Sequence, residues 1–181
     1  MGNLTSRYSE GKFQQNHFEN AFVNRLKSFL QIGVFPKDLL NLYCEFTPID
    51  FCGDAIINIA NHFNKNYTVF HLLNEKHVYL DRLFKMLKEI EIDIKLVTYS
   101  EFSDIIKEIL NDPDKKQYIS GIINDLTKDK KLVYKSDVKI KSDFTKEFLY
   151  KTGFEWPFID VNYIRKYFNY LKDIGYFNIK N

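Results

Sequence analysis

The apolar residues of this chain recur mostly three and four positions apart, the spacing that places side chains on one face of a helix. The pattern predicts helices that begin near Asn16, Asp50, Tyr79, Ser100, Pro113, Ser142 and Asp160. Several of these residues are good N-caps, and the glycines expected to end helices are Gly33, Gly153 and Gly175. The sequence therefore predicts about seven helices.

Strand signals are fewer and shorter. Runs of β-branched and aromatic residues predict strands at 42–46, 68–73 and 94–98. So few short strands cannot form a large sheet by themselves, and we expect the first two to pair with a sheet that lies outside this chain. The expected fold class is α+β, mostly helical, in a single domain over residues 1–181.

Two connections carry local signals. Asp112 followed by Pro113 is typical of a helix start, and apolar residues continue at helical spacing to Leu126. The segments on either side of Asp112 are therefore expected to form a helical hairpin. Thr47 and Pro48 are expected to make a turn, with Asp50 as the N-cap of the following helix.

Composition bounds the class of protein. A net charge of +2 does not by itself indicate a nucleic-acid or membrane partner, and no apolar run reaches the ~20 residues that cross a bilayer. We expect a cytoplasmic protein in which Cys44 and Cys52 are reduced thiols. Seventeen Phe and twelve Tyr predict either a core built on rings or an apolar surface that meets a partner.

Familiar catalytic patterns are weak or missing in the sequence. Tyr8 and Lys12 match the Tyr-x-x-x-Lys spacing of short-chain dehydrogenases, but that chemistry needs a helix, and Ser9 and Gly11 favour a loop here. No glycine-rich turn could seat a dinucleotide. We therefore assign no catalytic residue and no cofactor site to this chain. The cysteines and histidines match no paired-ligand spacing, so no metal site is assigned either.

The segment 127–141 is rich in lysine. It is either a solvated face or a docking patch for an acidic or phosphorylated partner, with nucleic acid as the weaker form of the second reading. The candidate docking residues are Lys128, Lys130, Lys131 and Lys135.

Several motifs follow one another in a recognisable order. They occupy residues 2–14 with Asn16, then 45–50, 55–56, 70–72 with Asn74, 99–102, 153–157, Asp160 and 175–177. In this order they resemble the thioester reductase domain that terminates nonribosomal peptide synthetases, an extended short-chain dehydrogenase/reductase. The resemblance covers nearly the whole chain, and its first two motifs are the most specific.

The resemblance implies that this chain is the C-terminal, substrate-side subdomain of such a domain. The family's N-terminal half is a Rossmann domain that binds NADPH and carries the catalytic residues, and this chain begins after it. Expected partners are that upstream domain and an acyl or peptidyl carrier protein with its phosphopantetheine arm. The full enzyme would release the tethered chain as an aldehyde or alcohol, whereas the fragment alone is expected to be inactive.

The opening motif also implies a substrate site. By position within it, the residues expected to line the substrate tunnel are Asn3, Arg7, Phe13, Gln14 and Asn16. The alternative function is a free-standing helical interaction module that binds a protein partner or nucleic acid through 127–141.

Overall fold

The computed structural model describes residues 3–63, 68–133 and 140–176. Within these ranges the helices are α1 (Ala21–Ile32), α2 (Ile49–His62), α3 (Leu80–Glu89), α4 (Tyr99–Asn111), α5 (Asp143–Lys151) and α6 (Val161–Asp173). Short 3-10 helices are η1 (His17–Glu19), η2 (Lys37–Leu39), η3 (Lys116–Ile119) and η4 (Ile123–Asp125). The mostly helical α+β class expected from the sequence is confirmed.

The described strands form three separate two-stranded ladders. β1 (Leu4–Thr5) runs parallel to β4 (Thr47–Pro48), and β2 (Val34–Pro36) runs parallel to β6 (Lys95–Val97). β3 (Tyr43–Cys44) pairs antiparallel with β5 (Val78–Tyr79). The expectation that the strand at 42–46 pairs outside this chain is therefore wrong, because β5 supplies its partner.

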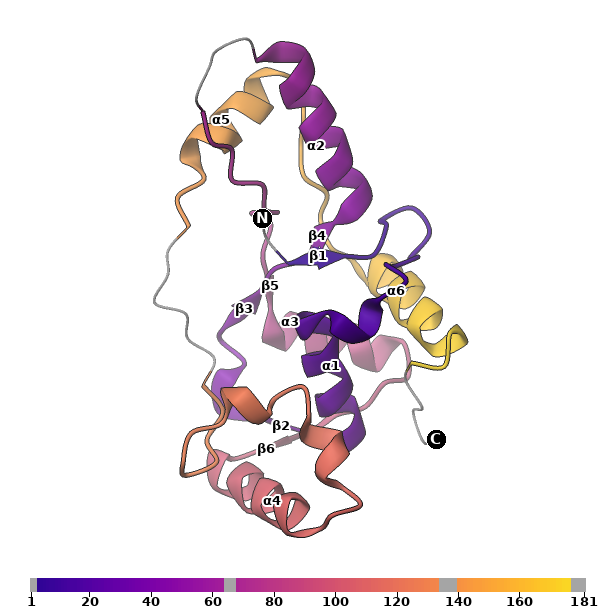
Figure 1. The fold of residues 1–181 in the computed structure, drawn as a ribbon, viewed down its shortest axis with the longest axis vertical. Helices are drawn as coiled ribbons and strands as arrows, with labels where there is room; N and C mark the ends of the chain where they lie inside the picture. Colours follow the sequence, from indigo (N-terminus) through magenta and orange to yellow (C-terminus); the bar gives the residue numbers. More distant parts are fainter. Residues whose placement is uncertain (1–2, 64–67, 134–139, 177–181) are drawn as a thin grey trace.

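The core lies in two parts along the long axis of the molecule (Figure 1). The larger part gathers buried side chains of α1, α3, α4 and α6, among them Phe102, Ile106 and Tyr167. The smaller part lies between α2 and α5 at the opposite end and consists of Cys52, Ala55, Leu72 and Leu149. The pair α2 and α5 therefore projects from the main body with a small core of its own.

Helix ends are partly as predicted. Gly33 ends α1 in the left-handed conformation (φ 68°), and the Asp160 carboxylate caps α6 by accepting from Tyr163 N. The predicted caps Asn16 and Ser100 are wrong by a few residues. Asn20 caps α1 by accepting from Val23 N, and Thr98 caps α4.

Three further predictions fail because contacts distant in sequence override local preference. Thr47 and Pro48 do not form a turn, because the first residues of the chain pair with them and Thr47 N donates to the Asn3 carbonyl (3.0 Å). The predicted hairpin helix at 113–126 is the two 3-10 turns η3 and η4, although Ile119 and Ile122 are fully buried as its apolar face requires.

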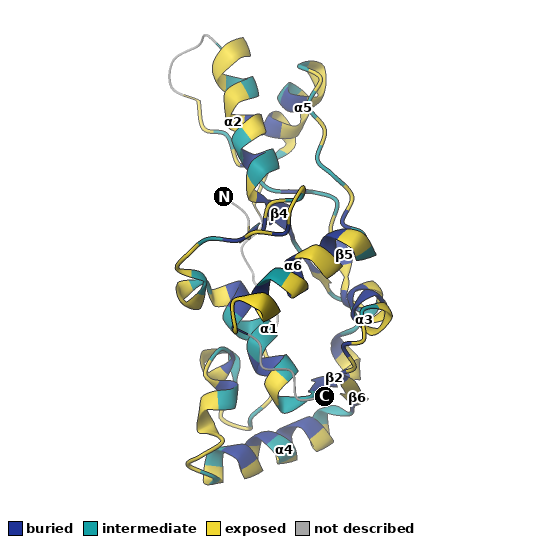
Figure 2. Ribbon diagram, turned by 90° about the vertical axis from the view of Figure 1, so that its right-hand side faces the viewer, coloured by how far each residue is buried: buried dark blue, intermediate teal, exposed yellow. Residues whose placement is uncertain are grey.

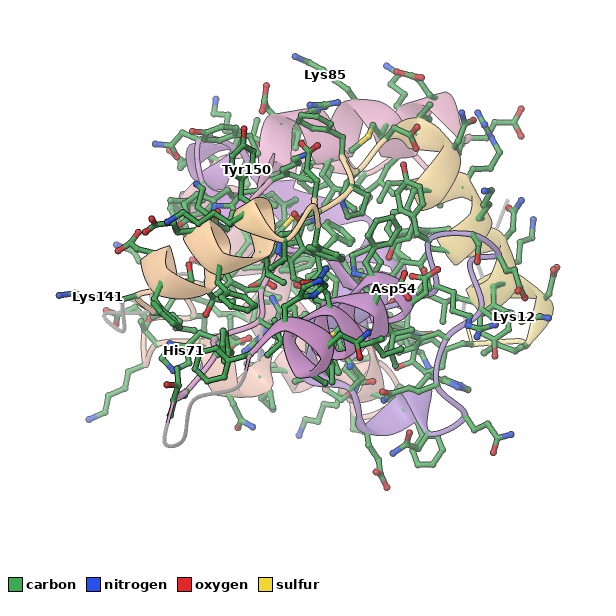
Figure 3. The ribbon with its side chains drawn as sticks, turned by 90° about the horizontal axis from the view of Figure 1, so that it is seen from above. Lys12, Asp54, His71, Lys85, Lys141 and Tyr150 are labelled. Atoms are coloured by element: carbon green, nitrogen blue, oxygen red, sulfur yellow. The ribbon has the colours of Figure 1, made fainter. Side chains whose placement is uncertain are left out.

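The predicted strand at 68–73 is the third failure. Its described part is irregular, with Leu72 buried and Val69 exposed. His71 ties it to α5, since His71 N donates to Thr145 Oγ1 (2.9 Å) and its ring approaches the Lys141 carbonyl (2.9 Å; Figure 3).

Candidate functional site

The opening loop, residues 6–12, is closed by its own backbone. Arg7 N donates to the Lys12 carbonyl and Gly11 N donates to the Arg7 carbonyl, both at 2.8 Å. The Asp50 carboxylate, in the first turn of α2, accepts from Tyr8 N (2.9 Å) and Ser9 N (3.2 Å). Asp50 is therefore not the N-cap predicted from the sequence; it anchors the opening loop to α2.

The same loop packs closely on α6. A Cβ at Gly11 would lie 2.4 Å from the Lys166 carbonyl carbon and oxygen, so only glycine allows this approach. Lys166 Nζ donates to the Ser9 carbonyl (3.0 Å), and the Tyr8 ring stacks on Tyr163 with centroids 5.3 Å apart. The loop is thus held between α2 and α6.

Tyr8 and Lys12 do not form a catalytic pair in this arrangement. The segment that contains them is a turn, not a helix. The Tyr8 hydroxyl donates to the Phe158 carbonyl (3.0 Å), whereas the Lys12 side chain points outward and pairs with Glu10 (2.8 Å; Figure 3). Tyr8 therefore serves to fix the loop, and Lys12 lies on the surface.

A buried hydroxyl cluster joins β1 to α6. The Tyr163 hydroxyl donates to Thr5 Oγ1 (2.7 Å) and accepts from Ser6 Oγ (3.1 Å). Burial raises the pKa of Tyr163 well above its ordinary value, so the phenol stays protonated and can donate. Because all three side chains are almost fully buried, the cluster holds the strand that leads into the loop.

A second junction, missed by the sequence analysis except as a motif position, centres on Asn74. Asn74 N donates to Thr47 Oγ1 (2.9 Å), and Asn74 Nδ2 donates to the Pro157 carbonyl (3.1 Å). The Thr47 hydroxyl also bonds to the Glu45 carboxylate. Asn74 thus links β4 to the segment before α6. Its complete burial marks this role in the structure.

The structure places the five expected substrate residues along the opening segment in different environments. Asn3 and Arg7 are exposed, and Arg7 pairs with Glu10 (3.3 Å). Phe13 is only 8% exposed and packs against Tyr167 in the main core. Two of the expected residues come together, since Gln14 Nε2 donates to the Asn16 carbonyl (3.3 Å).

The lysine-rich segment begins as a tight hairpin. Thr127 N donates to the Lys131 carbonyl (2.8 Å), and Lys130 closes the turn with φ 62°. Lys128 and Lys131 are exposed, and Lys130 is half-buried. Lys135, the fourth expected docking residue, lies outside the described residues.

Among the described residues, the cysteine thiols are buried and the acidic side chains do not gather into a metal site. Cys44 and Cys52 are buried thiols that form no disulfide within the described residues, and burial raises the pKa of the Cys44 thiol to about 12, so it stays protonated. In the described ranges, no group of three or more His, Cys, Asp or Glu side chains is placed to hold a metal ion. No helix in the described part of the chain is long and apolar enough to span a bilayer.

Comparison with known proteins finds similarity among solved structures. No family model and no curated protein matches the chain. A thiolation-reductase di-domain from an archaeal non-ribosomal peptide synthetase matches with a TM-score of 0.78 and 27% identity, over 97% of this chain and 35% of that chain.

Two further structures share the fold. The terminal R domain from the myxalamid PKS-NRPS biosynthetic pathway matches with a TM-score of 0.77 and 17% identity, over 99% of this chain and 44% of that chain. The Aureusimine biosynthetic cluster reductase domain matches with a TM-score of 0.70 and 21% identity, over 96% of this chain and 43% of that chain. The chain thus spans less than half the length of the structures it matches.

The fold is that of a mostly helical part of the larger reductase structures it matches. More particularly, the chain has the fold of part of the reductase domains of nonribosomal peptide synthetases, consistent with their C-terminal subdomain. The resemblance recognised from the sequence motifs is confirmed.

Proposed function

We propose that this chain is the substrate-side, carrier-facing part of an NADPH-dependent thioester reductase. The whole domain would release a phosphopantetheine-tethered acyl or peptidyl chain as an aldehyde or alcohol. The cofactor and the hydride-transfer machinery would belong to the rest of the polypeptide. Alone, the chain would be inactive.

The observation that carries this proposal is the second apolar face of α2. One side of the helix packs on α5 through the buried residues Cys52 and Ala55. Another side carries Ile49, Gly53, Ile56 and Ala60 at three- and four-residue spacing, and Ile56 is 50% exposed. A helix that is apolar on more than one side is normally covered on each of them.

Helix α5 lies at the same end of the molecule (Figure 2) and also has exposed aromatic side chains. Phe144 is exposed, and Tyr150 is 79% exposed and extends from α5 (Figure 3). Exposed apolar surface of this kind is typical of an interface. The matched structures are more than twice as long as this chain. We therefore propose that the remaining part of such a domain packs on the apolar surface of α2 and α5.

The opening loop supports a substrate role in the proposal. Its anchors on Asp50 and Lys166 fix the backbone and leave the Arg7 side chain exposed, and Asn3, shortly before the loop, is exposed as well. Guanidinium and amide groups can donate to the carbonyl groups of a tethered acyl chain and its pantetheine arm. In the proposal, Asn3, Arg7, Gln14 and Asn16 contact that chain while Phe13 supports the loop from the core.

The test compares the whole polypeptide, as its gene encodes it, with this chain alone. NADPH oxidation is measured with an acyl thioester on a carrier domain, and the aldehyde or alcohol is identified by mass spectrometry. We expect thioester-dependent oxidation only from the whole polypeptide. Turnover by the chain alone would contradict its incompleteness, and a whole polypeptide that does not use NADPH would contradict the reductase assignment.

A sequence observation provides an independent check. The reading frame before Met1 is expected to encode a glycine-rich dinucleotide turn and a helical Tyr-x-x-x-Lys motif. If that region has neither, the reductase proposal fails, and the helical interaction module becomes the better explanation.

A further inference from the structure

A groove lies at the end of the molecule opposite α2. It is bounded by the connection from η2 to β3 and by the hairpin of residues 127–133, here called the lysine hairpin. Its volume is about 320 Å³, and its apolar lining comes from Leu39, Leu42, Tyr99, Leu132 and Val133. This volume is at the lower end of the range for ligand pockets and can hold one or two large side chains.

The groove is preformed, because the hairpin that makes one wall is bonded to its neighbours. The Tyr99 hydroxyl donates to the Leu132 carbonyl (3.3 Å), and Val133 N donates to the Asp125 carbonyl (2.7 Å). Asp125 in turn forms an ion pair with Arg25 of α1 (2.5 Å). A wall fixed in this way loses little conformational entropy when a partner binds.

The hairpin that makes this wall carries more positive than negative charge, with Lys128, Lys130 and Lys131 against Asp129. Lys128 and Lys131 are exposed on the hairpin, and neither has an ion pair with any residue that the structure describes. Three lysines elsewhere, Lys107, Lys115 and Lys146, each pair with a nearby carboxylate. The hairpin lysines are therefore available to an external acid.

An acidic residue in the groove lining restricts what can enter. Asp38 lines the groove, and its carboxylate accepts from Tyr99 N (3.2 Å). A phosphate or nucleic-acid backbone in the groove would meet this negative charge, whereas an uncharged apolar side chain would not. The groove therefore favours a partner that inserts an apolar group and keeps its own acids at the rim.

We propose that this groove and the lysines of its hairpin wall dock an acidic protein surface, which inserts one apolar side chain between Leu42 and Val133 and places carboxylates against Lys128 and Lys131. The inference rests on the proposed function, under which this partner is the carrier domain that delivers the thioester. This docking site is separate from the apolar face of α2, so a partner can occupy each surface at the same time.

The experiment uses the whole polypeptide and two substrates with the same acyl group, one on a separately supplied carrier domain and one on free pantetheine. In the variant Lys128→Glu/Lys131→Glu, KM for the carrier-bound substrate is expected to rise about tenfold or more, because charge reversal at a rim weakens association. Val133→Asp is expected to act similarly through the groove. Turnover of the free pantetheine thioester is expected to be unchanged in both variants.

The matched control is Lys88→Glu/Lys172→Glu, which makes the same change in net charge at two exposed lysines on α3 and the α6 end. An equal loss in this control, or an equal loss with the free thioester, would overturn the proposed dock. So would an unchanged KM in the hairpin variant.

A binding measurement separates this inference from the proposed function. Fluorescence anisotropy of a labelled carrier domain added to the whole polypeptide does not require turnover. If neither substrate is reduced, the proposed function fails, while lysine-dependent carrier binding still supports the dock. Binding of a labelled single-stranded RNA that is tighter than carrier binding and steeply salt-dependent would overturn it.

Discussion

At the scale of single residues, Gly11 decides whether the opening loop can lie against α6. Its φ of +76° is unfavourable for any other residue, and an added Cβ would meet the Lys166 backbone at 2.4 Å. We expect Gly11→Ala to lower the free energy of unfolding by about 2–4 kcal/mol, which combines left-handed strain with overpacking. Urea unfolding followed by circular dichroism measures the change.

Gly33 provides the control for this prediction. It has a similar φ of +68°, but an added Cβ there meets nothing within 4 Å. Gly33→Ala is therefore expected to cost only the backbone strain, about 1 kcal/mol. Equal losses in the two variants would show that the contact with Lys166 contributes nothing.

Two buried tyrosines of α6 give opposite predictions for removal of a hydroxyl. Tyr163→Phe removes the hydrogen bonds that the described residues give the buried Thr5 and Ser6 hydroxyls and is expected to cost about 1–3 kcal/mol. The Tyr167 hydroxyl is also buried, but no described residue offers it a hydrogen bond. Tyr167→Phe is therefore expected to be neutral or stabilising, and thermal unfolding of the pair provides the comparison. A larger loss at Tyr167 than at Tyr163 would contradict this account.

At the scale of elements, α4 begins with a reciprocal capping box. Glu101 N donates to Thr98 Oγ1 (3.3 Å), and in return Thr98 N donates to the Glu101 carboxylate (2.7 Å). Thr98→Ala removes the cap and is expected to cost about 1 kcal/mol, whereas Thr98→Ser retains it. If the serine variant is as unstable as the alanine variant, the methyl group and not the cap carries the effect.

The same capping box predicts a pH dependence. Hydrogen bonds from the Thr98 backbone and hydroxyl lower the pKa of Glu101 in the folded chain. Because the folded pKa is lowered, the stabilisation is present above the ordinary carboxyl pKa and is lost as the pH falls through the folded value. Between about pH 7 and pH 3, the urea midpoint of the wild type is expected to fall further than that of Glu101→Gln. Parallel curves for the two proteins would contradict this prediction.

Helices were the elements most predictable from the sequence, because their signal is local. Residues three and four apart reveal a buried face whatever it packs against, so α3, α5 and α6 were found near their true bounds. The turn at Thr47 and the helix after Pro113 failed for the opposite reason. Their conformations depend on β1 and on packing of η3 against α1, and both contacts are distant in sequence.

At the scale of the whole molecule, the sequence motifs indicated which structures the chain resembles but not how its segments are joined. The Asn74 junction connects residues 27 and 83 positions apart, and the Tyr163 cluster connects residues 158 positions apart. Periodicity carries no information about such pairs. Asp50 shows the consequence, because its sequence context fits an N-cap equally well while its carboxylate holds the opening loop.

The exposed side of α2 gives a prediction that depends on how much of the polypeptide is present. In the chain alone, Ile56→Lys replaces a half-exposed side chain, so stability should change by no more than about 0.5 kcal/mol. Self-association of the chain, measured by sedimentation velocity, should decrease because less apolar surface is available. In the whole polypeptide, the same substitution would place a charge in the proposed interface and should cost about 2 kcal/mol or more.

Ile123→Lys is the matched control for this prediction, since Ile123 is similarly exposed (47%) but lies on η4 at the other end of the molecule. It should have little effect on the whole polypeptide. If Ile56→Lys also leaves the whole polypeptide unchanged, the remainder of the domain does not cover α2. The apolar face would then have to be explained by contact between copies of this chain, and sedimentation of the isolated chain would detect that association directly.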